Sequence, residues 1–284
     1  MIMNADLQKK VDAAIKLLQS TADIADDIEL CYSGGKDSDV ILELAKMAGI
    51  PFTAIYKNTT IDPPGTLEHV KSVGAEIVQP KRTFFELIEA KGFPTMRARF
   101  CCSDLKEYKI KDTAILGIRK EESVKRAKRY KEPIVCRIHN KQDHVNQILP
   151  ILDWTTQDVI DFIMDRRIKL APVYYPKDGI LGYYGIPDCS IRLGCIGCPL
   201  QSNKGVKDFK QYPKMLAKWI EHGKVWWENH PKAKSHKKFS SIYALMAHNL
   251  FFKSYSDFQA ADTSLFGDTN WKQALETYFN IELP

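Results

Sequence analysis

The sequence has no long apolar stretch. None of its 284 residues lie in a run that approaches the ~20 apolar residues of a membrane-spanning helix. Its first residues also lack the basic segment and apolar core of a secretory signal. Internal repeats and low-complexity segments are absent too. With 44% hydrophobic and 27% charged residues, the composition predicts a globular protein in the cytoplasm, with no membrane partner.

The sequence also lacks a strong excess of one charge sign. Its net charge of +6 suits an anionic partner, from a nucleotide to a nucleic acid, without choosing between them. The most basic run, residues 119–129, follows directly after a predicted strand. Such runs are usually solvated helix faces, but this one begins at the end of a strand where ligands bind.

The glycine-rich turn at residues 33–38 organises the chain. It follows an apolar run, Ile28–Tyr32, that reads as a buried strand, and it precedes a helical pattern over Val40–Met47. Strand, glycine turn and helix N-terminus together form a geometry that holds phosphate. The turn lacks the spacing of a Walker loop, because its two glycines are adjacent. Its residues are Ser33, Gly34, Gly35, Lys36, Asp37 and Ser38.

Strand and helix patterns alternate through the first two thirds of the chain. This alternation predicts an α/β fold with a doubly wound, mostly parallel sheet. Ligands bind beyond the carboxyl ends of such strands, so we expect Asn58 and Thr59, after the second strand, to face the same crevice as the glycine turn. After about residue 205 only helical spacing remains. We therefore predict a nucleotide-binding domain over 1–205 and a helical C-terminal extension over 206–284.

Five motifs, taken in order, resemble the phosphoadenosine phosphosulfate (PAPS) reductase family of the ATP pyrophosphatase superfamily. They are Ser-Gly-Gly-Lys-Asp-Ser (33–38), Cys-Cys-Ser-Asp-Leu-Lys (101–106), Gly-Ile-Arg-Lys-Glu-Glu-Ser-Val-Lys-Arg-Ala (117–127), Leu-Pro-Ile-Leu-Asp-Trp (149–154) and Cys-Ile-Gly-Cys (195–198). The resemblance implies an adenine nucleotide alpha-hydrolase-like fold. It also implies an enzyme that splits ATP between its α- and β-phosphates and adenylates an acceptor.

The chain is similar to three branches of this family. Sulfonucleotide reductases carry a redox cysteine near the C-terminus, whereas the last cysteine here is Cys198. The small subunit of sulfate adenylyltransferase shares the Gly-Ile-Arg motif, but a Cys-x-x-Cys is not expected in it. The ATP-dependent sulfur-transfer proteins of DNA phosphorothioation combine an intact ATP loop with the cysteine motifs. Here Arg99-Phe-Cys101 and Gly194-Cys-Ile-Gly-Cys198 fit that pattern.

Clustered cysteines in a chain of this kind indicate metal or redox chemistry. Cys101–Cys102 and the Cys195/Cys198 pair resemble the ligands of a [4Fe–4S] cluster, with Cys189 as a substitute for Cys102. A zinc site or a redox-active disulfide is the alternative. The nearby Arg99, Lys106 and Arg192 should favour thiolates. Cys31 and Cys136 lie in apolar runs and read as inert packing residues.

The resemblance also implies roles for single residues. ATP would lie on residues 33–38, with Asp37 binding magnesium and Lys36 holding the pyrophosphate. Arg119 and Arg126 would approach the α-phosphate or the acceptor. The acceptor would be anionic, with nucleic acid among the candidates. A cysteine desulfurase or a reductant would complete sulfur transfer.

Two other functions stay open at this point. One is reduction of a sulfonucleotide to sulfite, which needs an electron-delivering cysteine. The other is a non-catalytic nucleic-acid-binding partner that uses residues 119–129 and Lys214–Lys238. There Trp219, Trp226 and Trp227 could stack on bases, although tryptophans at helical spacing are more often core residues.

Overall fold

The computed structural model describes residues 4–139, 143–177, 180–200, 204–251 and 270–284. The chain divides into two compact units. The first comprises Met1–Asn58, Pro63–Gln79 and Tyr108–Leu193. The second comprises Thr59–Asp62, Pro80–Glu107 and Gly194–Pro284. This division is not a simple cut at residue 205, and the predicted domains 1–205 and 206–284 stay a prediction.

The first unit is built on a sheet of six strands in the order β3-β2-β1-β4-β6-β5. All neighbours run parallel except β5, which is antiparallel to β6. The predicted mostly parallel, doubly wound sheet is therefore confirmed. The strands are β1 Ile28–Tyr32, β2 Thr53–Lys57, β3 Glu76–Val78, β4 Thr113–Ile115, β5 Ile134–His139 and β6 Asp143–Ile148.

The strand order reverses direction between β1 and β4. From β1 the chain builds outward through β2 to β3, and it then returns to place β4 on the other side of β1. The carboxyl ends of β1 and β4 thus form the switch point at which open α/β sheets bind their ligands. The glycine turn follows β1, and Gly117-Ile118-Arg119 follows β4, so both predicted motifs meet at this point.

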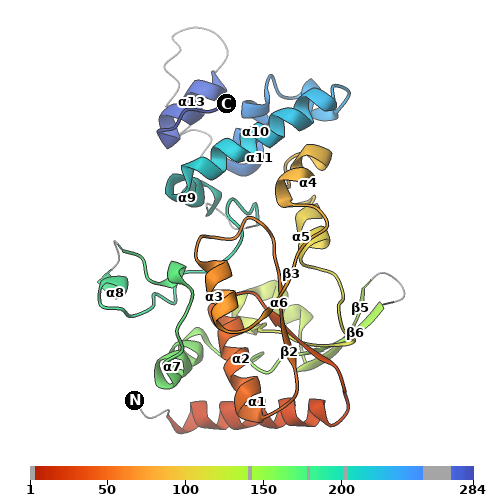
Figure 1. Ribbon diagram of the computed structural model, residues 1–284, viewed down its shortest axis with the longest axis vertical. Helices are drawn as coiled ribbons and strands as arrows, with labels where there is room; N and C mark the ends of the chain where they lie inside the picture. The colour runs from red at the N-terminus through yellow and green to blue at the C-terminus, as the bar shows by residue number, and fades with distance from the viewer. Residues whose placement is uncertain (1–3, 140–142, 178–179, 201–203, 252–269) are drawn as a thin grey trace. The chain divides into compact units, whose positions relative to one another are not determined.

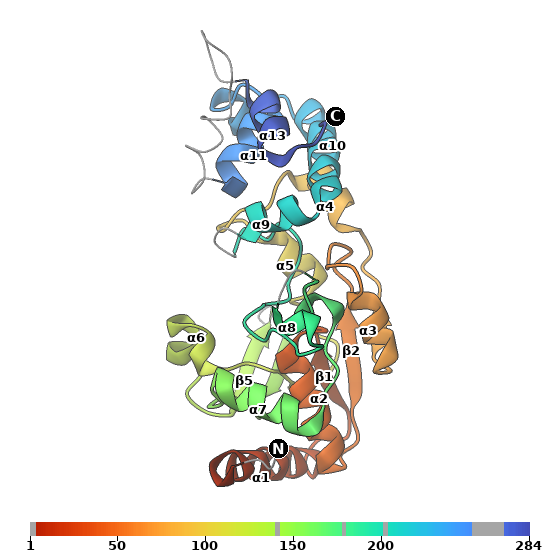
Figure 2. The same cartoon turned by 90° about the vertical axis from the view of Figure 1, so that its left-hand side faces the viewer.

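Helices α1, α2 and α7 pack against one another in the first unit (Figures 1 and 2). Their apolar stripes enclose one core with β1, in which Leu30, Val40 and Phe162 are fully buried. Thr155 caps α7 through a reciprocal pair of hydrogen bonds with Asp158, as its sequence predicts. The helical segments of this unit are α1 Ala5–Ala22, α2 Lys36–Ala48, α3 Thr66–Ser72, η1 Lys120–Glu122, α6 Val124–Arg129, α7 Thr156–Arg166, η3 Pro172–Tyr174 and α8 Ile180–Tyr183.

The second unit is helical in its described residues, which confirms the predicted helical C-terminal region. Its core surrounds Trp219, whose side chain is fully buried against the rings of Phe84, Phe93 and Phe209. Trp219 is thus a core residue and cannot stack on a base. The helical segments are α4 Phe84–Lys91, α5 Phe100–Leu105, α9 Lys204–Gln211, α10 Pro213–Asn229, η4 Lys234–Lys237, α11 Ile242–Phe251 and α13 Trp271–Phe279.

Strand β6 ends at Ile148, because Pro150 cannot donate to a strand ladder and the chain turns there. The stretch that follows α7 contains η3 and α8. The packing role that the sequence predicts for Cys136 was wrong. Cys136 is exposed rather than packed, because it lies on β5, which pairs only with β6 in the described sheet.

None of the helices in the described ranges combines the length and the apolar character that crossing a membrane requires.

Candidate active site

The glycine turn joins β1 to the first turn of α2. Gly34 has a φ of +72°, which residues with a side chain rarely adopt. A Cβ there would also lie only 3.1 Å from Cγ2 of Thr66, so both the backbone conformation and the space favour glycine. Ser38 Oγ donates to the carbonyl of Gly35 at 2.7 Å, and Ser33 Oγ lies 3.2 Å from Ser38 Oγ. The turn thus brings two hydroxyls and the helix N-terminus to one place, the arrangement that binds phosphate.

The segment after β4 closes one side of this turn. A Cβ on Gly117 would lie 2.9 Å from the carbonyl oxygen of Asp37, so only glycine allows the approach. On another side, Tyr174 accepts a hydrogen bond at its hydroxyl from the backbone N–H of Lys36 at 3.0 Å. Residues far apart in sequence therefore fix the start of α2.

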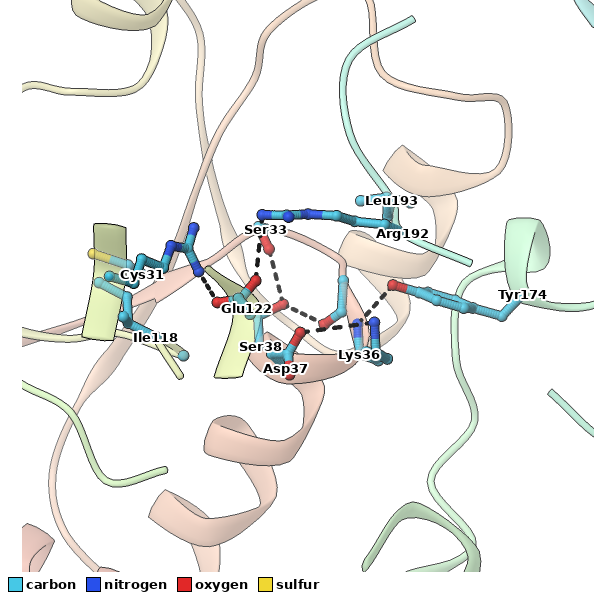
Figure 3. Close-up of a pocket in the computed structure, with 13 residues that line it drawn as sticks. Cys31, Ser33, Lys36, Asp37, Ser38, Ile118, Glu122, Tyr174, Arg192 and Leu193 are labelled. Atoms are coloured by element: carbon cyan, nitrogen blue, oxygen red, sulfur yellow. Dashed lines mark hydrogen bonds and ion pairs between the residues drawn. The ribbon is translucent and has the colours of Figure 1, made fainter. Parts of the chain in front are cut away.

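These segments enclose a polar cavity of about 160 Å³ in the first unit (Figure 3). By the same measure a cavity needs ~10–15 Å³ to hold one water, so there is space for a group much larger than water. The lining residues are Cys31, Ser33, Gly35, Lys36, Asp37, Ser38, Gly117, Ile118, Glu122, Arg126, Tyr174, Arg192 and Leu193.

Three cationic side chains line the cavity. A fourth contacts a carboxylate of the lining without lining the cavity itself. Lys36, Arg126 and Arg192 are in the lining. The fourth, Arg119, is 3% exposed and donates from Nε to Asp37 Oδ1 at 2.7 Å. The second carboxylate oxygen, Asp37 Oδ2, lies 3.9 Å from Lys36 Nζ.

Glu122 is the second carboxylate of the lining, and it contacts two guanidinium groups. Its Oε1 lies 3.2 Å from Arg192 Nη2 (Figure 3). Its Oε2 is paired with Arg126. The same Oε2 accepts the backbone N–H of Arg119 at 3.3 Å. Glu122 therefore holds Arg126 and Arg192 beside each other.

Burial and neighbouring positive charges destabilise the charged forms of the cations in this cavity. Burial lowers the pKa of Lys36, and the Arg119 and Arg192 charges add to that effect while Asp37 opposes it. Burial likewise lowers the pKa of Arg126, and the nearby Arg192 lowers it further. A bound anion would relieve both effects, so the electrostatics favour anion binding.

The structure brings most of the predicted nucleotide-site residues together. Ser33, Gly35, Lys36, Asp37, Ser38 and Arg126 line the cavity, and Arg119 acts through Asp37. Gly34 shapes the turn without lining the cavity. Asn58 instead donates to Gln79 Oε1 at 2.9 Å, and Thr59 belongs to the second unit. The assignment of Asn58 and Thr59 to nucleotide binding stays a prediction.

Tyr174, Glu122 and Arg192 were not predicted as site residues. Glu122 lies inside the quoted Gly-Ile-Arg motif, so that motif could have indicated it. Arg192 was expected to act on the cysteines, but its guanidinium is paired with Glu122 in the lining of the cavity at the glycine turn. Tyr174 lies in a stretch rich in Tyr, Gly and Pro that carries no signal for this contact.

Four of the predicted metal ligands line one small apolar pocket of the second unit. Cys101 and Cys102 come from α5, whereas Cys195 and Cys198 come from the turn before α9. The pocket also includes Thr59, whose hydroxyl accepts a weak hydrogen bond from Cys195 Sγ at 3.7 Å. Gly197 eases the turn with a φ of +77°. The two distant cysteine motifs are thus adjacent in space.

Cys189 lies elsewhere. It is buried in the core of the first unit, and the charge of Lys36 acts on it. Because Cys102 lines the pocket with Cys101, Cys195 and Cys198, it fits the fourth ligand position better than Cys189 does.

The thiols of this pocket differ in acidity. A hydrogen bond from Cys101 lowers the pKa of Cys102 to about 7, with Arg99 and Lys106 adding to that effect. Burial raises the pKa of Cys195 to about 11, although Lys106 opposes the rise. Lys106 therefore favours a thiolate at both cysteines, but burial outweighs this effect at Cys195.

The four thiols suit a [4Fe–4S] cluster in kind and number. All four are free of disulfides. However, within the described ranges no three His, Cys, Asp or Glu side chains meet as ligands of one metal ion would. The fit to a [4Fe–4S] cluster therefore rests on the type and number of the thiols and on their common pocket.

Residues 27–201 match the phosphoadenosine phosphosulfate reductase domain family. An uncharacterized protein of Methanocaldococcus jannaschii is 31% identical over 208 residues, which cover 68% of this chain and 47% of that protein. The chain thus spans about half the length of this relative. Sulfate adenylyltransferase subunit 2 of Shewanella pealeana is 26% identical, over 60% of this chain and 68% of its own length.

The solved structures that align with this chain are less similar to it in sequence than these relatives are. Phosphoadenylyl-sulfate reductase from Candida auris aligns with a TM-score of 0.43 and 14% identity, covering 63% of this chain and 96% of that chain. The U34-tRNA thiolase NcsA from Methanococcus maripaludis, solved with its [4Fe–4S] cluster, aligns with a TM-score of 0.38 and 14% identity, covering 80% and 82%. TM-scores this low carry no argument about function. The sequence match, which spans more than half of the chain, shows that the protein belongs to the phosphoadenosine phosphosulfate reductase domain family.

Proposed function

We propose that this protein binds ATP at the glycine turn and cleaves it to AMP and pyrophosphate, adenylating an acceptor. The observation that supports this most is the intact Ser33–Ser38 turn at the N-terminus of α2, facing a cavity lined by Lys36, Arg126 and Arg192. Likeness to sulfate adenylyltransferase subunit 2 favours the same class of reaction.

The chain's own groups suit chemistry at the α-phosphate. An acceptor oxygen forms a bond to the α-phosphorus, while the bond from that phosphorus to the bridging oxygen breaks. Pyrophosphate leaves with the bonding electron pair, and its negative charge grows as it leaves. Lys36 and the positive end of the α2 dipole stabilise that charge, because they are already in place before the reaction.

Arg119 and Arg126 have different roles in this proposal. Arg119 is buried and fixes the Asp37 carboxylate, so it is a positioning residue. Arg126 lines the cavity and contacts the α-phosphate or the acceptor. Asp37 offers one carboxylate to magnesium, which usually binds nucleotides through one or two carboxylates and the phosphate oxygens.

We further propose that the adenylated acceptor receives sulfur, which displaces AMP. The cysteine pocket supports this, with Cys101, Cys102, Cys195 and Cys198 as the residues that would hold a [4Fe–4S] cluster. Such a cluster supplies a carrier for sulfur or for electrons. A cysteine desulfurase is the class of sulfur donor that fits, together with a thiol reductant that supplies the two electrons needed to bring its persulfide sulfur to the sulfide level. The sulfide then forms a bond to the adenylated centre while AMP leaves with the bonding electron pair. Iron and sulfide analysis after anaerobic purification tests this part: colourless protein with one equivalent of zinc would contradict it.

Reduction of a sulfonucleotide is less well supported. It needs an accessible cysteine that delivers electrons. Outside the pocket of Cys101, Cys102, Cys195 and Cys198 (the thiol pocket), Cys189 is only 6% exposed, burial raises the pKa of Cys31, and the exposed Cys136 does not line the cavity.

The experiment for the adenylation step uses ATP labelled at the α-phosphate, with sulfate, a tRNA or a DNA duplex as acceptor. We expect the label in AMP or in an adenylated acceptor. Label in ADP would reject the proposal, because it places cleavage between the β- and γ-phosphates.

A further inference from the structure

We infer that His69 is a positioning residue for the proposed nucleotide site, because it fixes the two residues that flank the glycine turn. The inference rests on the proposed binding of ATP at this turn. It assigns a task to a buried side chain that neither lines the cavity nor takes part in the proposed chemistry. The two flanking residues are Tyr32, which ends β1, and Asp39, in the first turn of α2.

Side-chain hydrogen bonds connect the two ends of the turn. The Tyr32 hydroxyl donates to Asp39 Oδ1. His69 Nε2 lies 3.0 Å and 3.2 Å from the two carboxylate oxygens of Asp39, and 2.9 Å from the Tyr32 hydroxyl oxygen. An ionised carboxylate only accepts, and Tyr32 uses its single proton on Asp39, so the N–H at His69 Nε2 is the donor to both groups. One imidazole thus holds a residue on each side of the turn.

This network of three side chains is shielded from water. Tyr32, Asp39 and His69 are 3%, 3% and 7% exposed. A buried carboxylate that loses a donor cannot replace it freely with water, so the loss is costly unless the carboxylate moves. The three side chains therefore favour one arrangement, and that arrangement fixes how the end of β1 faces the start of α2.

The helix that carries His69 also contacts the turn itself. Thr66, three positions before His69, and Val70, four positions after Thr66, lie on the same side of α3 as His69. A Cβ on Gly34 would lie 3.1 Å from Thr66 Cγ2 and 3.6 Å from Val70 Cγ2, so both side chains lie beside the turn. A shift of α3 away from Asp39 would open this contact. His69 therefore also anchors α3 where it shapes the turn.

The shape of the turn matters for binding, because a site that already has its bound shape loses less conformational freedom when the ligand arrives. The turn presents Ser33, Lys36 and Ser38 to the cavity. When the network around Asp39 is broken, part of the ligand's binding free energy goes into reordering these residues. His69 should therefore affect the affinity for nucleotide although it lies outside the lining of the cavity.

The test measures binding of the α,β-methylene analogue of ATP, which cannot be cleaved at the reacting bond. Titration calorimetry is run at a temperature where circular dichroism shows every variant to be folded. His69→Leu removes the donor but keeps a side chain that can fill the space, and it should weaken binding by about tenfold or more. His69→Gln keeps an N–H donor near the position of Nε2, so its affinity should stay within about threefold of the wild-type value.

Tyr32→Phe is a milder test of the same network, because it removes one hydroxyl and leaves the ring in the core. It should weaken binding of the analogue by about threefold to tenfold. Since Tyr32 and His69 hold the same carboxylate, the Tyr32→Phe/His69→Leu double variant should lose less binding free energy than the two single losses added together. Fully additive losses would contradict a shared network.

Leu18→Ala is the matched structural control. Leu18 is fully buried on α1, and its neighbour Gln19 donates to the carbonyl of Ala48, the last residue of α2. The variant thus destabilises the same unit near the end of α2 that lies opposite the turn. Urea unfolding should show the loss of stability, whereas the affinity for the analogue should stay within about threefold.

Three further results would overturn the inference and leave the proposed function intact. They are an unchanged affinity in His69→Leu, equal losses in His69→Leu and His69→Gln, and a loss in Leu18→Ala as large as that in His69→Leu. Failure of the wild-type protein to bind the analogue at all would instead contradict the proposed function.

Discussion

The cavity at the glycine turn, which we propose as the nucleotide cavity, and the thiol pocket are built in opposite ways. The first is polar, and one continuous strand–turn–helix supplies six of its lining residues, Cys31, Ser33, Gly35, Lys36, Asp37 and Ser38. The second is apolar, and its four thiols come from two segments about ninety residues apart. The backbone fixes the first site locally, whereas only helix packing around Trp219 brings the second together. The two sites should therefore respond differently to substitution.

Removing one cation from the nucleotide cavity should have the largest effect. Lys36→Ala deletes the charge that stabilises the leaving pyrophosphate, and kcat should fall by ~10²–10³ or more. Lys46→Ala is the matched control, because Lys46 is an exposed lysine on the same helix. Steady-state ATP turnover measures both, and equal losses in the two variants would show that Lys36 has no special role.

The [4Fe–4S] cluster that we propose for the thiol pocket should be lost when one ligand is removed. Cys195→Ser and Cys102→Ser should each reduce bound iron to near background, whereas Cys189→Ala should keep it, because Cys189 lies in the core of the other unit. Iron and sulfide analysis of anaerobically purified protein provides the measurement. Iron loss in Cys189→Ala with retention in Cys102→Ser would reverse the assignment of the fourth ligand.

The core around the thiol pocket should depend on Trp219. Trp219→Ala removes a fully buried ring that packs on Phe84 and Phe209, and the free energy of unfolding should fall by about 3–5 kcal/mol. Val124→Ala on α6 is the control, since Val124 is 71% exposed and its loss should change stability by less than about 0.5 kcal/mol. Urea unfolding compares them, and similar midpoints would contradict the assigned core.

Cysteine reactivity should separate the nucleotide cavity from the solvent-exposed sheet edge. Burial and the nearby Glu29 raise the pKa of Cys31, so at pH 8 less of it is thiolate and it should alkylate slowly. Cys136 is exposed and should react at least about tenfold faster. Peptide mass spectrometry after a timed maleimide pulse resolves the two, and the rate at Cys31 should rise with pH. Faster reaction at Cys31 would contradict its burial.

The sequence alone predicted those parts of the fold and of the candidate site that residues close together in the chain form. The turn at 33–38 and the motif holding Arg119 and Arg126 were predicted to lie together, because each follows a strand whose carboxyl end lies at the switch point of the sheet. The parallel sheet followed from the alternation of strand and helix patterns. Thr83 and Thr155 cap α4 and α7 through reciprocal hydrogen bonds with residues three positions further along, so these caps too depend on neighbouring residues.

What the sequence missed depends on tertiary contacts. Tyr174 reaches Lys36 across 138 positions, and no local pattern marks such a contact. Arg192 lies next to the cysteine motif in sequence but is paired with Glu122 in the structure. The placement of Thr59 beside Cys195 likewise depends on which unit residues 59–62 join. The spacing of residues along the sequence does not predict these tertiary contacts.

The central claim is that cleavage occurs at the α-phosphate. The most direct measurement follows ATP labelled at the γ-phosphate with the wild-type protein and an active acceptor. We expect the label to appear in pyrophosphate and to become inorganic phosphate only after a pyrophosphatase is added. Label released directly as inorganic phosphate, together with ADP, would contradict the account.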